Sequence, residues 1–399
     1  MFFNTGKKEE CCGCRACANI CPKDAIVMKM DDEGFFYPQK NDKCINCGLC
    51  EKACPYNPIN LRIRDNNLNQ EYPIAFAAYG EKERIGSSSG GIFYSIAKRV
   101  LSENGIVYGA AFDEELQLHH VSAISEEELQ NLRGSKYIQS DIGCVFKEIK
   151  LNLETNKYVL FVGTPCQVAG LKSYLNKKYE KLLLIDLICH GVPNQWLFNE
   201  HIKYLENKSK LKLINYQFRD NEGWGGCEIC NFTNQTGTLN KTVKLPTYEL
   251  SPYLYSFMYA FTYRYSCYEC PFSKIPRQGD ITLGDFWGIQ KIFPKMDYSK
   301  GISSIVINTS KGLKIWDVIK DSLVYKKSDW ETVALNNKNL IEHTSKPEIR
   351  DGVYQMIKER GYSSIASNEF KSSQYMKAYI KSYIKRIPGV KFLLRIVKK

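Results

Sequence analysis

Two cysteine runs near the start of the sequence constrain this chain more than any other feature. Each run follows the spacing C-x2-C-x2-C-x3-C and is followed directly by a proline, Pro22 in the first case and Pro55 in the second. Thiolate sulfur is the soft ligand that iron–sulfur clusters need. Structural zinc sites usually come as paired C-x2-C units instead. The tandem repeat therefore predicts two iron–sulfur clusters rather than zinc.

The spacing also predicts how the eight cysteines are shared. It is the spacing of bacterial two-cluster ferredoxins, in which the fourth cysteine of each run binds the other cluster. Cys12 fits neither run and is expected to bind no metal. The expected ligand sets are Cys11, Cys14, Cys17 and Cys54 for the first [4Fe-4S] cluster, and Cys44, Cys47, Cys50 and Cys21 for the second.

The chain is too long to be a ferredoxin alone. Its 399 residues, 44% apolar and 25% charged, are enough for about two or three globular domains. Cluster cysteines must stay reduced, which predicts a reducing compartment. No signal-peptide pattern and no apolar stretch of about eighteen residues is found, so we expect a cytoplasmic protein without a membrane span.

A strand pattern at 73–79 leads into a Ser/Gly-rich loop, and a helical pattern follows at 92–101. Such a loop points free backbone N–H groups and the positive helix end at one spot, which favours the phosphate of an anionic cofactor. The alternative is a helix N-cap with permissive glycines. Lys136, in a basic turn, is either a second anion contact or a solvated side chain. The candidate loop residues are Ser88, Ser89, Gly90 and Gly91.

Two further β-loop-α patterns follow, with strands at 157–162 and 181–188. Consecutive units of this kind predict parallel strands whose carboxyl ends share one edge, where ligands bind. Cys166 and Cys189 each come just past a strand end. With Cys267 and Cys270 they would form a third four-thiolate site, which we expect to hold another [4Fe-4S] cluster.

Two alternatives to the third cluster remain open. One is a zinc site formed by Cys227, Cys230, Cys267 and Cys270, although its internal gap is longer than is usual in zinc ribbons. The other is the absence of any metal, with buried cysteines acting as small apolar residues.

Several motifs together resemble the coenzyme F420 hydrogenase/dehydrogenase beta-subunit family. They are the Ser/Gly loop at 87–91, Gly163 to Leu171, Asp186 to Pro193, Cys267 to Phe272, and Gly279 to Gly288. The resemblance runs from about residue 73 to about residue 320, and a ferredoxin module fused ahead of it is known in this family. Members with such a module often occur alongside polysaccharide-synthesis enzymes.

The resemblance implies an FAD-containing oxidoreductase that passes electrons between the clusters and a hydride acceptor or small-molecule substrate, with coenzyme F420 as the family's namesake. The loop at 88–91 and Lys136 are then candidates for the flavin phosphates, and Thr164 and His190 lie nearer its ring. His190 or Asp285 would donate a proton to substrate or flavin; the alternative for His190 is a hydrogen bond that orients its loop. Implied partners are ferredoxin or a hydrogenase/dehydrogenase subunit. The alternative is an electron-transfer adapter without its own substrate.

The net charge of +12 arises largely at the end of the chain, where 371–399 hold nine Lys or Arg and no acidic residue. The rest is nearly balanced, so nucleic acid is not expected as a partner. The tail either contacts an anionic membrane peripherally or packs on the protein or a partner.

The expected fold class is an α+β ferredoxin-like two-cluster domain, then an α/β domain with a partly parallel sheet, then a helical C-terminal tail. The expected boundaries are 1–60 for the cluster domain, 61–72 for a linker, 73–155 and 156–325 for the two parts of the oxidoreductase domain, and 326–399 for the helical region with its basic tail.

Overall fold

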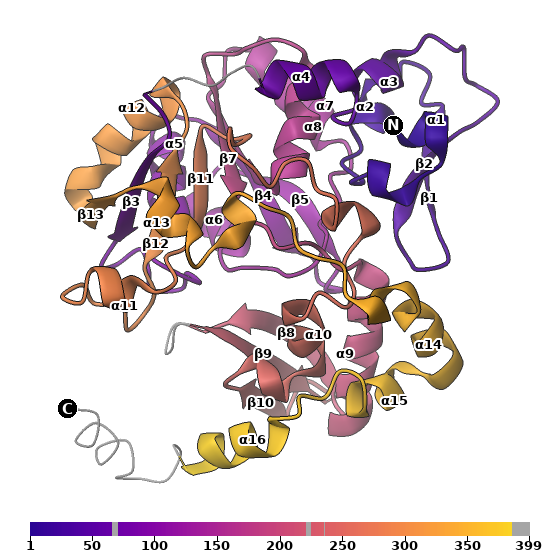
Figure 1. Cartoon of the computed structure of the whole chain (residues 1–399), viewed down its shortest axis with the longest axis vertical. Helices are drawn as coiled ribbons and strands as arrows, with labels where there is room; N and C mark the ends of the chain where they lie inside the picture. The colour runs from indigo at the N-terminus through magenta and orange to yellow at the C-terminus, as the bar shows by residue number, and fades with distance from the viewer. Residues whose placement is uncertain (66–70, 221–224, 235, 385–399) are drawn as a thin grey trace.

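The chain folds into a ferredoxin module, a central sheet covered by helices, and a smaller lobe (Figure 1). The structure is a computed structural model that describes residues 1–65, 71–220, 225–234 and 236–384. Part of the expected linker and most of the basic tail therefore lie outside the described residues. Within those residues, no helix is long and apolar enough to cross a membrane.

The ferredoxin module is a two-stranded antiparallel sheet flanked by short helices, as the cysteine runs predict. Register pairs Ile26 with Lys40 and Met30 with Phe36. One short helix begins within each cysteine run. The elements are α1 (Phe2–Thr5), α2 (Ala16–Ile20), β1 (Ile26–Met30), β2 (Phe36–Lys40), α3 (Leu49–Lys52) and α4 (Pro58–Asp65).

The central sheet has eight strands in the order β13-β3-β12-β11-β7-β6-β4-β5. β4, β6, β7 and β11 run parallel. β3 points the same way, because β3 and β11 both pair antiparallel with β12. The expected partly parallel sheet is thus confirmed. Its strands are β3 (Ile74–Tyr79), β4 (Ile106–Phe112), β5 (Leu118–Ala123), β6 (Val159–Gly163), β7 (Leu182–Leu187), β11 (Ile281–Asp285), β12 (Ser303–Ile307) and β13 (Val324–Ser328).

Helices cover both faces of this sheet, which explains why β6 and β7 are nearly continuous apolar runs. Leu160 and Leu183 belong to a core shared with α5 and α12, whereas Phe161 and Leu184 belong to a core shared with α7 and α8. The helices around the sheet are α5 (Ile92–Ser102), α6 (Glu126–Leu132), α7 (Val145–Glu154), α8 (Pro165–Leu175), α11 (Ile289–Ile292), α12 (Ser310–Ile319) and α13 (Trp330–Ala334).

The smaller lobe, at the bottom of Figure 1, is a three-stranded antiparallel sheet in the order β10-β9-β8, packed with helices. The sequence predicted only turn-rich β structure here. A second unexpected feature is β13, which crosses the expected boundary at 325/326 and joins the main sheet beside β3. The lobe contains α9 (Gln195–Ser209), β8 (Lys212–Arg219), β9 (Gly226–Thr233), β10 (Asn240–Leu245), α10 (Pro252–Met258), α14 (Val353–Arg360), α15 (Tyr362–Ser367) and α16 (Tyr375–Ile384).

Candidate functional site

The eight cysteines of the ferredoxin module gather in two separate cavities, and their grouping is the one that the sequence predicts. α2 connects the cavities, because Cys17 lies within this helix and Cys21 ends it. The first cavity is lined by Cys11, Cys14, Cys17 and Cys54, and the second by Cys21, Cys44, Cys47 and Cys50.

A third cavity, of about 30 Å³, is lined by Cys166, Cys189, Cys267 and Cys270. Cys166 lies in the first turn of α8, directly after β6, and Cys189 follows β7. Cys267 ends the 3-10 helix Tyr265–Cys267, and Cys270 lies in the turn after it. The structure therefore brings together the four thiols expected to form the third site.

The four thiols of this third site all have raised pKa values. Burial, reinforced by the neighbouring thiols, raises the pKa of Cys189 to about 12 and that of Cys267 well above its ordinary value. Four crowded, buried thiols lose their protons together only when a positive charge compensates the thiolates, as a metal site does. The donor set thus fits an iron–sulfur cluster.

The rival zinc pair lies elsewhere. Cys227 and Cys230 are both on β9, and neither lines the cavity of Cys267 and Cys270. A strand directs residues three apart to opposite faces. Accordingly, Cys230 contacts the Glu228 carboxyl group, whereas the Cys227 thiol lies near Arg219. The two thiols are therefore not arranged to bind one zinc ion.

Cys12, which was expected to be a bystander, connects the first and third cavities. Its buried side chain lines both of them, together with Tyr56. Its thiol lies beside the thiols of Cys14 and Cys166, one expected ligand of each site. Gly170 of α8 allows the ferredoxin module to pack closely against this helix, because a Cβ at position 170 would lie 2.8 Å from the Cys14 sulfur.

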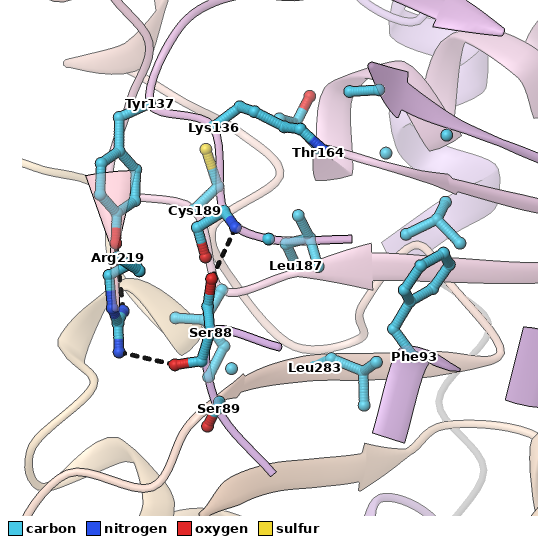
Figure 2. A pocket seen from close by; sticks show the side chains of 18 of the residues that line it. Ser88, Ser89, Phe93, Lys136, Tyr137, Thr164, Leu187, Cys189, Arg219 and Leu283 are labelled. Carbon is cyan, nitrogen blue, oxygen red and sulfur yellow. Dashed lines mark hydrogen bonds between the residues drawn. The ribbon is translucent and has the colours of Figure 1, made fainter. Parts of the chain in front are cut away.

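The fourth and largest cavity, about 300 Å³, lies at the carboxyl edge of the central sheet. This volume is at the lower end of the range usual for small-molecule sites. Loops after β3, β6, β7 and β11 all contribute to its wall, as expected for an α/β ligand site. In Figure 2, Arg219 reaches Ser88 and Tyr137 along one wall, and Phe93 and Leu283 lie opposite.

In the Ser/Gly loop the two glycines have packing and capping roles, whereas the Ser89 hydroxyl has no hydrogen-bond partner among the described residues. The Gly90 N–H donates to Ser303 Oγ at 3.0 Å, and a Cβ at Gly90 would collide with the Ala78 carbonyl. Gly91 caps α5 with a left-handed φ of 81°. The N-cap alternative therefore accounts for Gly91, whereas the close approach of the Ala78 carbonyl accounts for Gly90. Ser89 Oγ, in contrast, is buried in the cavity wall without a hydrogen-bond partner among the described residues.

Lys136 also lines this cavity, at the loop after α6. Its Nζ donates to the carbonyl oxygens of Arg133 at 2.8 Å and Asn131 at 3.0 Å. Burial lowers its pKa to about 7. Lys136 is therefore not the solvated side chain of the alternative interpretation. An anion in the cavity would restore its charge.

The two predicted proton donors occupy different positions. Asp285, at the end of β11, accepts from Arg219 Nη1 at 2.8 Å and from Nη2 at 3.3 Å. His190 follows Cys189 and is exposed. Asp285 is thus held by an ion pair, whereas His190 lies at the boundary between two cavities.

The third and fourth cavities share one wall. It consists of residues from the loops after β6 and β7, three of which were predicted as site residues. The shared residues are Thr164, Cys189, His190, Gly191 and Val192. The thiol site and the large cavity are therefore adjacent. The first, third and fourth cavities adjoin one another through shared wall residues, and α2 links the first cavity to the second.

Comparisons with known proteins agree with this arrangement. Residues 156–332 match the family model for the C terminus of the coenzyme F420 hydrogenase/dehydrogenase beta subunit, and residues 10–65 match the model for the 4Fe-4S dicluster domain. The family resemblance is confirmed. The matched residues thus describe a 4Fe-4S module followed by a region similar to the F420 hydrogenase/dehydrogenase beta subunits.

A solved structure is also similar to this chain. It is a chain of the F420-reducing [NiFe] hydrogenase complex from Methanosarcina barkeri, from a xenon-derivatization study, with 17% sequence identity and a TM-score of 0.43. The alignment covers 72% of this chain and 91% of that chain. No curated protein matched this chain.

Sequence reasoning missed several residues of this beta-subunit-like region. Arg219 comes from β8 of the smaller lobe, with no motif around it. His120, on β5, is buried against Phe161, and Ser140 Oγ lies 2.7 Å from its Nδ1; burial lowers its pKa to about 4. Cys12 alone carried a signal, because it is a cysteine beyond the number that the two clusters need.

Proposed function

We propose that this protein is an iron–sulfur flavoprotein oxidoreductase that passes electrons between [4Fe-4S] clusters and FAD, and on to a hydride acceptor or small-molecule substrate. The observation that carries the proposal is the series of cavities, three lined by cysteines and one lying at the sheet edge. Shared wall residues join the third cavity to both the first and the fourth. This is the arrangement that an electron relay requires.

Three cluster sites are part of the proposal. The first two take the ligand sets expected from the sequence. Cys12 is left as a non-ligand thiol between the first and third sites, because it fits neither cysteine run and lines both cavities. The proposed ligands of the third [4Fe-4S] cluster are Cys166, Cys189, Cys267 and Cys270.

The large cavity is the proposed FAD site. Ser89 Oγ and the Lys136 amine are proposed to contact the flavin phosphates, and Ser88, Gly90 and Gly91 hold the loop that carries Ser89. Arg219 supplies a second buried cation in the wall. A bound flavin would supply the conversion between one-electron and two-electron transfer.

Thr164 and His190 are the proposed contacts on the side nearer the flavin ring. Thr164 is fixed by a hydrogen bond from its backbone N–H to Gln167 Oε1 at 2.9 Å. The His190 carbonyl accepts from Thr344 Oγ1 at 2.6 Å, which anchors the loop. Of the two candidate proton donors, His190 fits better, because both carboxylate oxygens of Asp285 accept from Arg219.

The test is anaerobic reduction of bound FAD by reduced ferredoxin in wild type and in Cys267→Ser. The substitution removes a proposed third-cluster ligand, so FAD should stay bound while its reduction through the clusters is lost. Cys144→Ser, which changes an exposed cysteine at the start of α7, is the matched control and should behave as wild type. Unchanged flavin reduction in Cys267→Ser would reject the relay. Flavin reduction without turnover of any added acceptor would indicate the adapter instead.

We also propose that the end of the chain contacts an anionic membrane surface. α16 exposes apolar side chains at positions i, i+3, i+4 and i+8, with exposed fractions of 62% for Met376, 50% for Tyr379, 52% for Ile380 and 42% for Ile384. Lys377 and Lys381 lie on the same helix, and the tail that follows is basic. Apolar and basic groups together on an exposed helix are typical of interfacial binding.

A further inference from the structure

A buried arginine lies at the boundary between the ferredoxin module and the third cavity. Arg264 comes three residues before Cys267 and lines the cavity of the third site. It is 1% exposed. Its backbone N–H donates to Val192 O, and its carbonyl accepts from Cys267 N, so the main chain is fixed on the side of the third site.

The guanidinium points the other way, to the first cluster site. Nε donates to Cys11 O at 2.6 Å and Nη2 to Phe36 O at 2.8 Å. Nη2 also lies 3.6 Å from Cys11 Sγ, and Nη1 lies 3.3 Å from Gln139 Oε1. All four acceptors are carbonyl, amide or thiol groups. Among the described residues, no carboxylate forms an ion pair with Arg264.

A second buried arginine, Arg350, differs from Arg264 in having a carboxylate partner. Arg350 is 0% exposed and stacks, like Arg264, over the Phe35 ring. Its two terminal nitrogens donate to the Glu33 carboxylate at 2.8 and 2.6 Å. A buried charge is costly unless it is paired. The counter-ion of Arg350 is the Glu33 carboxylate, whereas the Arg264 guanidinium lies against Cys11 Sγ, the sulfur of a proposed cluster ligand.

The other charges around the first cavity are already compensated. Arg15 is paired with Asp141, and Glu10 with the N-terminal amine. At the second cavity the nearby cations are Lys23, which is exposed, and Lys40, which pairs with Glu51 at 3.4 Å. Arg264 is therefore a buried, uncompensated cation that faces the first cluster site and not the second.

We propose that Arg264 is the counter-cation of the first cluster and raises its reduction potential above that of the second. Four thiolates outweigh the positive charge of an iron–sulfur core, and one-electron reduction adds one more negative charge without any change in bonding. Net charge and hydrogen bonds to the sulfurs set such potentials, and a buried charge acts through a low dielectric. An electron on the second cluster is thereby drawn to the first, next to Cys12 and the third site. This inference rests on the ligand sets in the proposed function.

The experiment is an anaerobic potentiometric titration, followed by electron paramagnetic resonance, of wild type, Arg264→Gln and Arg350→Gln. The second-cluster signal is identified with Cys47→Ser, which changes an exposed proposed ligand of that cluster alone. In Arg264→Gln the first cluster should become at least tenfold harder to reduce, a fall of about 59 mV for a one-electron couple. The second cluster should not move. Arg350→Gln should leave both potentials unchanged.

Arg264→Lys tests the charge separately from the donor geometry. It keeps the cation but loses the fork of N–H groups, so the first-cluster potential should fall less than in Arg264→Gln. It also serves if Arg264→Gln fails to fold. An unchanged first-cluster potential in a variant with intact clusters would overturn the inference, and so would equal shifts in Arg264→Gln and Arg350→Gln. Protein without clusters would instead reject the ligand sets, and with them the proposed function.

Discussion

The sequence contains two C-x2-C pairs after residue 200, and they illustrate the difference between the cavity-bearing sheet edge and the smaller lobe. Cys267 ends a 3-10 helix, and Cys270 comes directly after the turn that follows it. Both face one cavity with Cys166 and Cys189. Cys227 and Cys230 have the same spacing but lie on β9, where they face different surroundings.

The C-x2-C spacing therefore predicts a pair of metal ligands only when the local secondary structure is known. At the sheet edge, four strand-end loops converge, so polar and thiol groups from distant segments meet. In the smaller lobe, Cys230 is part of a core with Phe218, Phe232 and Tyr253. We therefore expect substitutions at the sheet edge to change cofactor content, and substitutions in the smaller lobe to change stability.

The largest effect should come from matched changes in the two pairs. Cys270→Ser should remove the third cluster and lower the iron content by about four atoms per chain, because a [4Fe-4S] site needs its thiolates. Cys230→Ser should leave the iron content unchanged. Iron and acid-labile sulfide in anaerobically purified protein provide the measurement. Equal iron loss in both variants would mean that the two cysteine pairs do not differ in their contribution to iron binding.

A stability effect is expected next, in the smaller lobe. Glu228 is buried beside His201, with 3.0 Å between Oε2 and Nε2, and it also accepts from Tyr216 OH at 2.8 Å. Leaving a buried hydrogen-bonding group unsatisfied costs about 1–3 kcal/mol. Glu228→Gln should therefore lower Tm in thermal unfolding. Its iron and flavin content at low temperature should match wild type, and a loss of iron would contradict the division between the two regions.

A smaller effect is expected for the pH dependence of FAD binding in the large cavity. Below pH 7 the Lys136 amine is protonated, and above pH 7 it becomes neutral, because burial lowers its pKa to about 7. FAD affinity should therefore fall as pH rises from about 6 to 8. Titration calorimetry of deflavinated protein with FAD measures this change.

The matched control for Lys136→Met is Lys311→Met. Lys311 Nζ also donates to two carbonyl oxygens, those of Tyr179 and Leu182, but Lys311 does not line the cavity. Lys136→Met should flatten the pH dependence, and Lys311→Met should preserve it. A pH dependence that persists in Lys136→Met would show that another group controls it.

The smallest effect concerns α16. Replacing Met376 and Ile380 with glutamate should reduce cosedimentation with anionic vesicles several-fold, because both residues lie on the exposed apolar face. Leu151→Glu, at a residue 64% exposed on α7, is the control. Vesicles of neutral lipid should bind weakly in every case, and strong binding to them would argue against the basic tail as a contributor.

Much of the chemistry could be predicted because it is encoded locally. The two cysteine runs determine the first two sites, and the β-loop-α patterns place Cys166 and Cys189 at one sheet edge. The role of Cys12 could not be predicted, because it depends on how the ferredoxin module packs against Gly170 of α8. Arg219 and Arg264 reach their sites from distant segments, and neither lies in a recognisable motif.

Some pairings of the fold have no local sequence signal. β13 pairs with β3, about 250 residues earlier in the sequence, and no local pattern shows this partner. The lobe around β8, β9 and β10 is stabilised by aromatic packing, such as Phe198 against Phe218 and Tyr253, rather than by a periodic apolar pattern. Contacts of this kind join segments that are far apart in the sequence, so no local pattern indicates them.

The most direct test of the central claim is a single analysis of anaerobically purified protein for iron, sulfide, zinc and flavin. Three cluster sites and one flavin site predict about twelve iron atoms and one FAD per chain, without zinc. About eight iron atoms without flavin would contradict the relay, and the chain would then be a two-cluster ferredoxin module joined to an adapter domain.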